Sequence, residues 1–139
     1  MAPRRTPRAG SLQPDKKYLT SDAQGAAYEL ATAKLAVSKA SSPAVRQYAQ
    51  MLVEDHEKFD TALIKLGQDE GVTLPTNMTA KDQARLAILD RLEGVTFDKV
   101  YVREALRINQ QDEKDSKKEL ARTKDPRIKQ FLQQFAEVD

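Results

Sequence analysis

The sequence predicts an all-α protein, in the form of a four-helix bundle with a short crossover helix. Three observations carry this prediction. Apolar residues recur at steps of three and four along several long segments, as on one face of a helix. Glycine and proline stand nearly always between those segments, where helix boundaries fall. No segment shows the sustained alternation of apolar and polar residues that is typical of a β-strand.

The composition indicates one domain with a basic beginning. At 139 residues the chain is long enough for a single core. Residues 1–19 hold five basic residues and three prolines, which predicts a disordered basic arm, a linker or residues added to the native chain. Residues 20–139 are then the helical domain, and their slightly acidic balance predicts no specific nucleic-acid partner.

The sequence lacks the residues for cysteine chemistry and the long apolar runs of membrane-spanning segments. It has no cysteine, so disulfides, thiolate metal sites and cysteine nucleophiles are excluded. No apolar run approaches the roughly 18 to 20 residues of a transmembrane helix, and no signal peptide is recognisable in the sequence as given.

The first two long helices have clear start signals. A capping box at Ser21 predicts a helix over 21–41. Ser42 before Pro43 is an N-cap followed by proline at the first helical position, which predicts a second helix over 43–71. That helix carries a seam at steps of four and three that we expect to face the core: Val45, Ala49, Leu52, His56, Phe59, Leu63 and Leu66.

Two threonines predict the next boundaries. Thr79 is the expected cap of a short helix over 80–93, and Thr96 that of a third long helix over 97–123. The third long helix has an apolar beginning and a strongly charged second half. Its expected seam again steps by four and three, with polar residues in the middle: Val102, Leu106, Asn109, Glu113, Ser116 and Leu120.

The last helix and the long connection complete the predicted architecture. Asp125 before Pro126 is another N-cap, and the helix that follows is predicted to be truncated because it has scarcely half the length of the second one. A connection of roughly 25 residues, itself partly helical, joins the second and third long helices. Among four-helix folds a long crossover is typical of ferritin-like bundles, so a ferritin-like bundle is the predicted fold.

Several motifs resemble those of one bacterial family. The longest is "KLAVSKASSPAVRQYAQMLVEDHEKFDTAL" at 34–63, followed in order by "GVTLP" at 71–75, "FDKVY" at 97–101 and "KDPRIKQF" at 124–131. These segments resemble the family called domain of unknown function 4142, over about residues 20 to 135. The resemblance implies a ferritin-like fold and an exported or periplasmic protein of the bacterial cell envelope, with an unassigned biochemical role.

The chain departs from the family pattern in its histidines. The family usually repeats an Asp-His pair in the third long helix, where this chain has Ile108 and Asn109. It also tends to carry a histidine late in the last helix. His56 is the one histidine here, so the histidine cluster that the resemblance implies is reduced to a single member.

His56 is the centre of the candidate site. A carboxylate-bridged di-iron site needs two Glu-x-x-His turns, and the residue three before His56 is Val53, so ferritin-type iron chemistry is not expected. Two alternatives stay open. The first is a single divalent metal ion; the second, which we favour, is a hydrogen-bonded polar layer that includes Asn109 and needs no ion. The expected metal ligands are His56, Glu29, Glu113 and Asp60.

No other pattern predicts a reaction. No nucleophile motif and no phosphate-binding loop is present, and a single histidine leaves little scope for acid–base catalysis. We therefore predict a non-enzymatic binding or structural module of the cell envelope, without a cofactor and with a protein partner that the sequence does not identify. The alternative is a metal-binding or metal-storage bundle with a His/carboxylate site in mid-core. The sequence does not set the oligomeric state.

Overall fold

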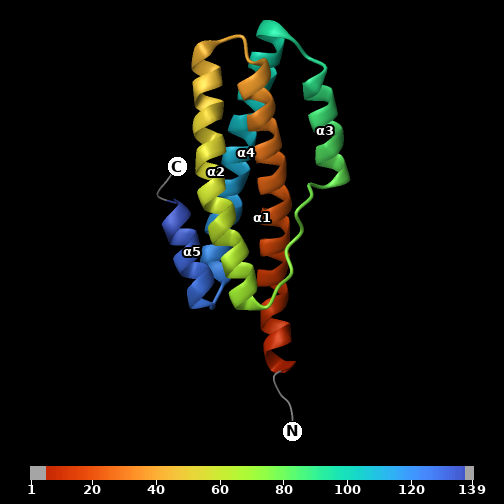
Figure 1. Ribbon diagram of the computed structural model, residues 1–139. Helices are drawn as coiled ribbons and strands as arrows, with labels where there is room; N and C mark the ends of the chain where they lie inside the picture. The colour runs from red at the N-terminus through yellow and green to blue at the C-terminus, as the bar shows by residue number, and fades with distance from the viewer. Residues whose placement is uncertain (1–5, 137–139) are drawn as a thin grey trace.

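The computed structural model describes residues 6–136, with side chains described over 13–135. Within this range it contains five helices and no strand, as Figure 1 shows, so the all-α prediction is confirmed. The helices are α1 (Thr6–Lys39), α2 (Pro43–Glu70), α3 (Ala80–Asp90), α4 (Gly94–Arg122) and α5 (Pro126–Ala136).

Four of the helices surround a common core. α1 and α2 are antiparallel, and the connection 71–79 then climbs back along the molecule to α3 (Figure 1). As a result α4 runs in the same direction as α2, and the short α5 reverses again beside their lower ends. α1 packs against α2 and α4, and α5 packs against the same two helices, while α3 lies outside against α1 and α4.

Most of the predicted boundaries are confirmed. Ser42 is the N-cap of α2, with its hydroxyl accepting a hydrogen bond from the Val45 amide, and Pro43 is the first helical residue. Thr79 caps α3 in the same way. The prediction for Thr96 is wrong: α4 starts three residues earlier than predicted, at Gly94 instead of Phe97, because the left-handed backbone of that glycine (φ 58°) lets the chain turn directly into the helix.

The prediction of a disordered arm is wrong for the part of it that the structure describes. α1 begins at Thr6, and Leu19 is only 1% exposed. This side chain belongs to a core cluster that includes Ile128 and Leu132 of α5. The helix is stabilised here by tertiary packing that its proline-rich, basic composition does not reveal. Residues 1–5 of the predicted arm lie outside the described residues.

Two core clusters hold the helices together. The lower one joins α1, α2 and α5 through large apolar side chains such as Leu66 and Phe131. The upper one joins α1, α2, α3 and α4, and its α1 and α2 members are alanines, whose small side chains let these two helices approach closely. The alanines pack with the rings of Phe97 and Tyr101, which are 0% and 1% exposed.

At each end of the molecule, carboxylates that accept hydrogen bonds join neighbouring helices. At the upper end, Asp98 of α4 accepts hydrogen bonds from the Ser41 amide (2.9 Å), the Ser41 hydroxyl (2.8 Å) and the Ser42 amide (2.8 Å). These bonds fix the turn between α1 and α2 onto the start of α4.

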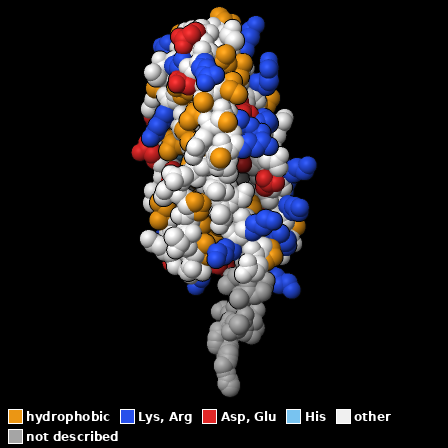
Figure 2. Space-filling model, turned by 90° about the vertical axis from the view of Figure 1, so that its right-hand side faces the viewer, with side chains coloured by type: hydrophobic (Ala, Val, Ile, Leu, Met, Phe, Trp, Pro, Cys, Tyr) orange, Lys and Arg blue, Asp and Glu red, His pale blue; other side chains and the backbone are white. Residues whose placement is uncertain are grey.

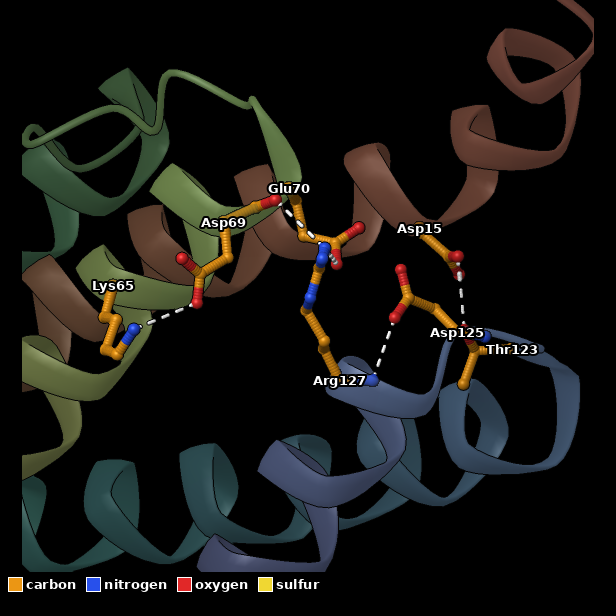
Figure 3. A network of polar contacts seen from close by, with 7 residues as sticks. All are labelled: Asp15, Lys65, Asp69, Glu70, Thr123, Asp125 and Arg127. Atoms are coloured by element: carbon orange, nitrogen blue, oxygen red, sulfur yellow. Dashed lines mark hydrogen bonds and ion pairs between the residues drawn. The ribbon is translucent and has the colours of Figure 1, made fainter. Parts of the chain in front are cut away.

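Figure 3 shows the polar contacts at the lower end. Arg127 of α5 donates to the Asp69 carbonyl (3.0 Å) and the Glu70 carboxylate (3.2 Å) of α2. Asp125 accepts from the Arg127 amide (2.9 Å), which confirms it as the predicted cap of α5. The Thr123 hydroxyl donates to Asp15 of α1 (3.2 Å), so all four core helices are joined at this end.

The expected seam of α4 is wrong by about one residue. Val102 and Leu106 are 45% and 56% exposed, and the buried positions are instead Phe97, Tyr101, Ala105, Ile108 and Glu119. Consecutive residues are 100° apart around a helix, so a shift of one position turns a different side toward α1. The larger rings on the true seam decide which side is buried, because they remove more apolar surface from water.

The surface is mixed in character. Figure 2 shows the face over α3 and the connection before it, where hydrophobic side chains run down the upper middle and basic ones gather along one edge. None of the described helices combines the length and the apolar character needed to cross a membrane.

Candidate functional site

The buried centre of the molecule is a contact between Glu29 of α1 and His56 of α2. The imidazole Nε2 meets the Glu29 carboxylate directly. The two side chains are 13% and 9% exposed, and the imidazole packs edge-on against Phe59 at 5.8 Å between ring centroids. His56 therefore lies on the core-facing seam of α2, as the spacing of the apolar residues predicted.

The electrostatic surroundings favour a charged imidazole. Burial alone would lower the pKa of His56, but the hydrogen bond to Glu29 and its negative charge outweigh burial, and the pKa is raised above its ordinary value. The charges of Asp60 and Asp22 act in the same direction. The raised pKa favours the protonated imidazole, which forms an ion pair with the Glu29 carboxylate.

Two further carboxyl groups surround this pair, and sequence reasoning missed both. Burial and the negative charge of Glu29 raise the pKa of Asp22 on α1 to about 7. Burial and the charges of Glu29 and Asp22 raise the pKa of Asp112 on α4 to about 8, although Asp112 as a whole residue is exposed. A hydrogen bond to the Glu29 carboxyl contributes to the same rise in the pKa of Asp112.

The two carboxylate oxygens of Glu29 have different surroundings. One oxygen, Oε1, faces His56, and the other, Oε2, is buried without a bond from any amide, hydroxyl or basic group of the described residues. A protonated Asp112 is a suitable donor to it. Three helices therefore contribute to the site: α1 with Asp22 and Glu29, α2 with His56, and α4 with Asp112.

The other residues predicted for the site lie in different places. Asp60 is one turn after His56, is half-buried, and affects the imidazole through its charge. Glu113 is 60% exposed and accepts a hydrogen bond from Lys117 at 2.8 Å, so it does not approach Glu29 or His56. Asn109 is also exposed and donates to the Tyr48 hydroxyl at 3.3 Å. Both misplacements follow from the shifted seam of α4.

The geometry limits what the site can do chemically. Within residues 6–136, no group of three or more His, Asp or Glu side chains is arranged to hold a metal ion. The Nε2 atom of His56 already contacts Glu29, and a charged imidazole is neither a base nor a metal ligand. The arrangement is that of a polar layer that links helices.

The comparison with known protein families agrees with the motifs of the sequence. The family described as domain of unknown function DUF4142 matches residues 1–138. The chain belongs to this family. Neither the curated proteins nor the solved structures gave a match.

In this DUF4142 domain a solvent-filled groove reaches part of the site. It lies between α1 and α4, has a volume of about 450 Å³, and is lined by Asp22, Gly25, Ile108 and Asp112 among others. Glu29 and His56 do not line it. The two carboxyl groups with raised pKa values therefore line the groove, while the ion pair does not.

A second hollow of about 420 Å³ lies between α1, α2 and the connection 71–79. Its walls are mainly apolar, with Lys34 and Asp60 as the charged members. Burial raises the pKa of Asp60, and the charges of His56 and Lys34 oppose that rise. The site is thus flanked by a polar groove on one side and an apolar hollow on the other.

The sequence holds weak signals for the two carboxyl groups that were missed. Asp22 stands seven residues before Glu29, which places both on one side of α1. Asp112 stands four residues after Ile108, and so continues the true seam of α4. Asp112 was missed because the wrong row of α4 residues was predicted to be buried.

Proposed function

We propose that this DUF4142 domain is a non-enzymatic binding or structural module of the bacterial cell envelope, and that Glu29 and His56 form a structural ion pair within it. The observation that carries this proposal is the direct contact between the imidazole Nε2 and the Glu29 carboxylate. A catalytic base must reach its substrate, whereas His56 is 7% exposed and lines neither hollow of the surface.

The order of the helices supports a ferritin-like four-helix bundle as the fold of this module. α2 and α4 run in the same direction and are joined by a connection that climbs the length of the molecule, as Figure 1 shows. Such a long crossover is a feature of ferritin-like bundles. The envelope location rests on the family resemblance, and detection of the native protein in periplasmic rather than cytoplasmic fractions tests it.

A second candidate function is the binding of a divalent metal ion. It is favoured by the carboxyl groups of Asp22 and Asp112, whose pKa values are raised by burial and by the negative charge of Glu29. The residues that would take part are these two, together with Glu29 and His56. Binding requires that His56 lose its proton, which costs the ion pair with Glu29. We therefore rank this candidate below the structural one.

Metal titration of the protein without a histidine tag separates the two candidates. Manganese, iron(II) and zinc are added in turn, and bound metal is measured by elemental analysis after desalting. The structural proposal predicts no stoichiometric retention of any of them. Retention of one ion per chain that is lost in His56→Ala, but kept in the control Glu113→Gln, would establish the metal site instead.

A further inference from the structure

The outer side of α4 carries exposed apolar residues. Val95, Val102 and Leu106 are 64%, 45% and 56% exposed. They belong to one row of positions at steps of four and three, as in the contact row of a coiled coil, which we call the outer seam of α4. Its members are Val95, Lys99, Val102, Leu106, Asn109 and Glu113.

The lower continuation of this seam shows what it is suited to contact. Leu120, seven residues after Glu113, packs against the cluster that contains the α5 residues Ile128 and Phe131. α5 ends at Ala136 in the described structure and lies beside the lower ends of α2 and α4 (Figure 1). This side of α4 is therefore covered by α5 near Leu120 and exposed from Val95 to Leu106.

The exposed part extends onto α2. The Tyr48 hydroxyl accepts a hydrogen bond from Asn109, which brings α2 next to the outer seam at this level. Met51, one turn along α2 from Tyr48, is 48% exposed. Monomeric soluble proteins rarely expose several large apolar side chains together, and such patches usually mark contacts with another molecule.

We propose that a second copy of this chain binds the outer seam, with the two α4 helices antiparallel about a two-fold axis near Leu106. The charges on the seam fit this partner. Lys99 stands seven residues before Leu106 and Glu113 stands seven residues after it. In an antiparallel pair centred on Leu106, Lys99 of each copy lies opposite Glu113 of the other. The two-fold axis therefore creates this pairing of opposite charges two times.

A parallel pair does not fit the same seam. It would place Lys99 opposite Lys99 and Glu113 opposite Glu113, and like charges across a helix pair are repulsive. Glu113 already accepts a hydrogen bond from Lys117 of its own helix, but both side chains are largely exposed and an exposed pair of this kind is weak. Glu113 is therefore available to a partner's lysine.

The size of the seam sets the expected strength. From Val95 to Glu113 it is about 28 Å long at 1.5 Å per residue. One helix strip with the adjoining side chains of α2 is smaller than the roughly 800 Å² per partner of a standard interface. We therefore expect a weak dimer, with a dissociation constant on the order of 10 to 100 µM.

Sedimentation equilibrium over a concentration range that spans this constant tests the proposal. The unaltered protein is expected to pass from monomer to dimer. Leu106→Glu is expected to leave it monomeric at every concentration, with unchanged helical content and thermal midpoint, because Leu106 lies outside the core. The matched control is Ile88→Glu, on the α3 surface and 59% exposed, which should dimerise as the unaltered protein does.

The charges test the antiparallel arrangement. Lys99→Glu and Glu113→Lys are each expected to weaken the dimer by about tenfold, and the double variant to restore it. A chain that remains monomeric throughout, as it would if the seam served a different protein, overturns the proposal. A dimer that is insensitive to Leu106→Glu, or one that the double charge exchange fails to restore, overturns it too.

Discussion

The Glu29 carboxylate and the His56 imidazole contact each other across α1 and α2, and both are largely shielded from solvent. Neither residue belongs to the apolar clusters that pack the two ends of the molecule. The contact therefore joins the two helices by charge, in addition to the apolar packing at either end. Its surroundings contain more carboxyl groups than cations, which makes the pair sensitive both to substitution and to pH.

Replacement of Glu29 by Gln should destabilise the fold. The substitution leaves a buried imidazole without its anionic partner, and the expected loss in free energy of unfolding is about 1 to 3 kcal/mol. Urea denaturation at neutral pH measures it. Glu113→Gln is the matched control, since that carboxylate is 60% exposed, and it should change the free energy by less than about 0.5 kcal/mol. Equal effects of the two substitutions would contradict the buried pair.

The stability of the protein should fall as the pH rises from about 4 to about 8. The pKa values of Asp22 and Asp112 in the fold are raised to about 7 and about 8, and that of His56 is raised above its ordinary value. Each raised group binds its proton more tightly in the folded state, so the stabilisation it provides is lost as the pH passes its folded pKa.

Denaturant unfolding at several pH values measures this dependence. Asp22→Asn, which removes one of the titrating groups, should flatten the profile between about pH 4 and about pH 7. A free energy of unfolding that stays constant, or that increases, over this pH range would show that the pKa values of Asp22 and Asp112 are not raised in the fold.

Phe59→Ala should be costly although Phe59 is only half-buried. Its ring packs against Phe135 at 5.1 Å, Phe131 at 5.5 Å and His56 at 5.8 Å between centroids. Loss of the ring leaves a cavity between α2 and α5, and the expected cost is about 3 to 5 kcal/mol. Ile88→Ala on the exposed side of α3 is the control. A loss below about 1 kcal/mol would mean that α5 does not pack as described.

Asp98→Ala should lower the thermal midpoint by releasing the upper turn. Burial tends to raise the pKa of Asp98, but the bonds from the Ser41 amide and hydroxyl and from the Ser42 amide outweigh it and lower the pKa. The stabilisation is therefore present above the unfolded pKa of the group and lost as the pH falls through its folded pKa. The difference in thermal midpoint between Asp98→Ala and the unaltered protein should disappear at acid pH. The control Asp90→Ala should have the thermal midpoint of the unaltered protein at neutral and at acid pH.

Local signals in the sequence were enough to predict most of the helices. They were not enough to predict which face of every helix is buried. Ser42, Thr79 and Asp125 act on neighbouring backbone amides, so their effect is visible in the sequence itself. On α4, however, Val102 and Leu106 form a regular row beside that of Tyr101 and Ile108. Which row is buried depends on α1 and α3, and spacing along one helix does not contain that information.

The same limit explains the partial success with the site. His56 was predicted because it lies on the seam that the apolar residues of α2 define, and Glu29 because the family resemblance implies an acidic residue at its position. Asp112 was missed in favour of its neighbour Glu113, since the wrong row of α4 was chosen. The start of α1 was missed because Leu19 is held by α5, more than a hundred residues later, while Pro14 and the basic residues nearby resemble a disordered segment.

The protonation of His56 tests the central claim most directly, and the chain has only this one histidine to observe. An NMR titration of its ring protons measures the pKa in the folded protein. The ion-pair account predicts a pKa above the ordinary value of about 6.5, and a lower pKa in Glu29→Gln. A pKa below about 6.5 in the unaltered protein, unmoved by that substitution, would contradict the account.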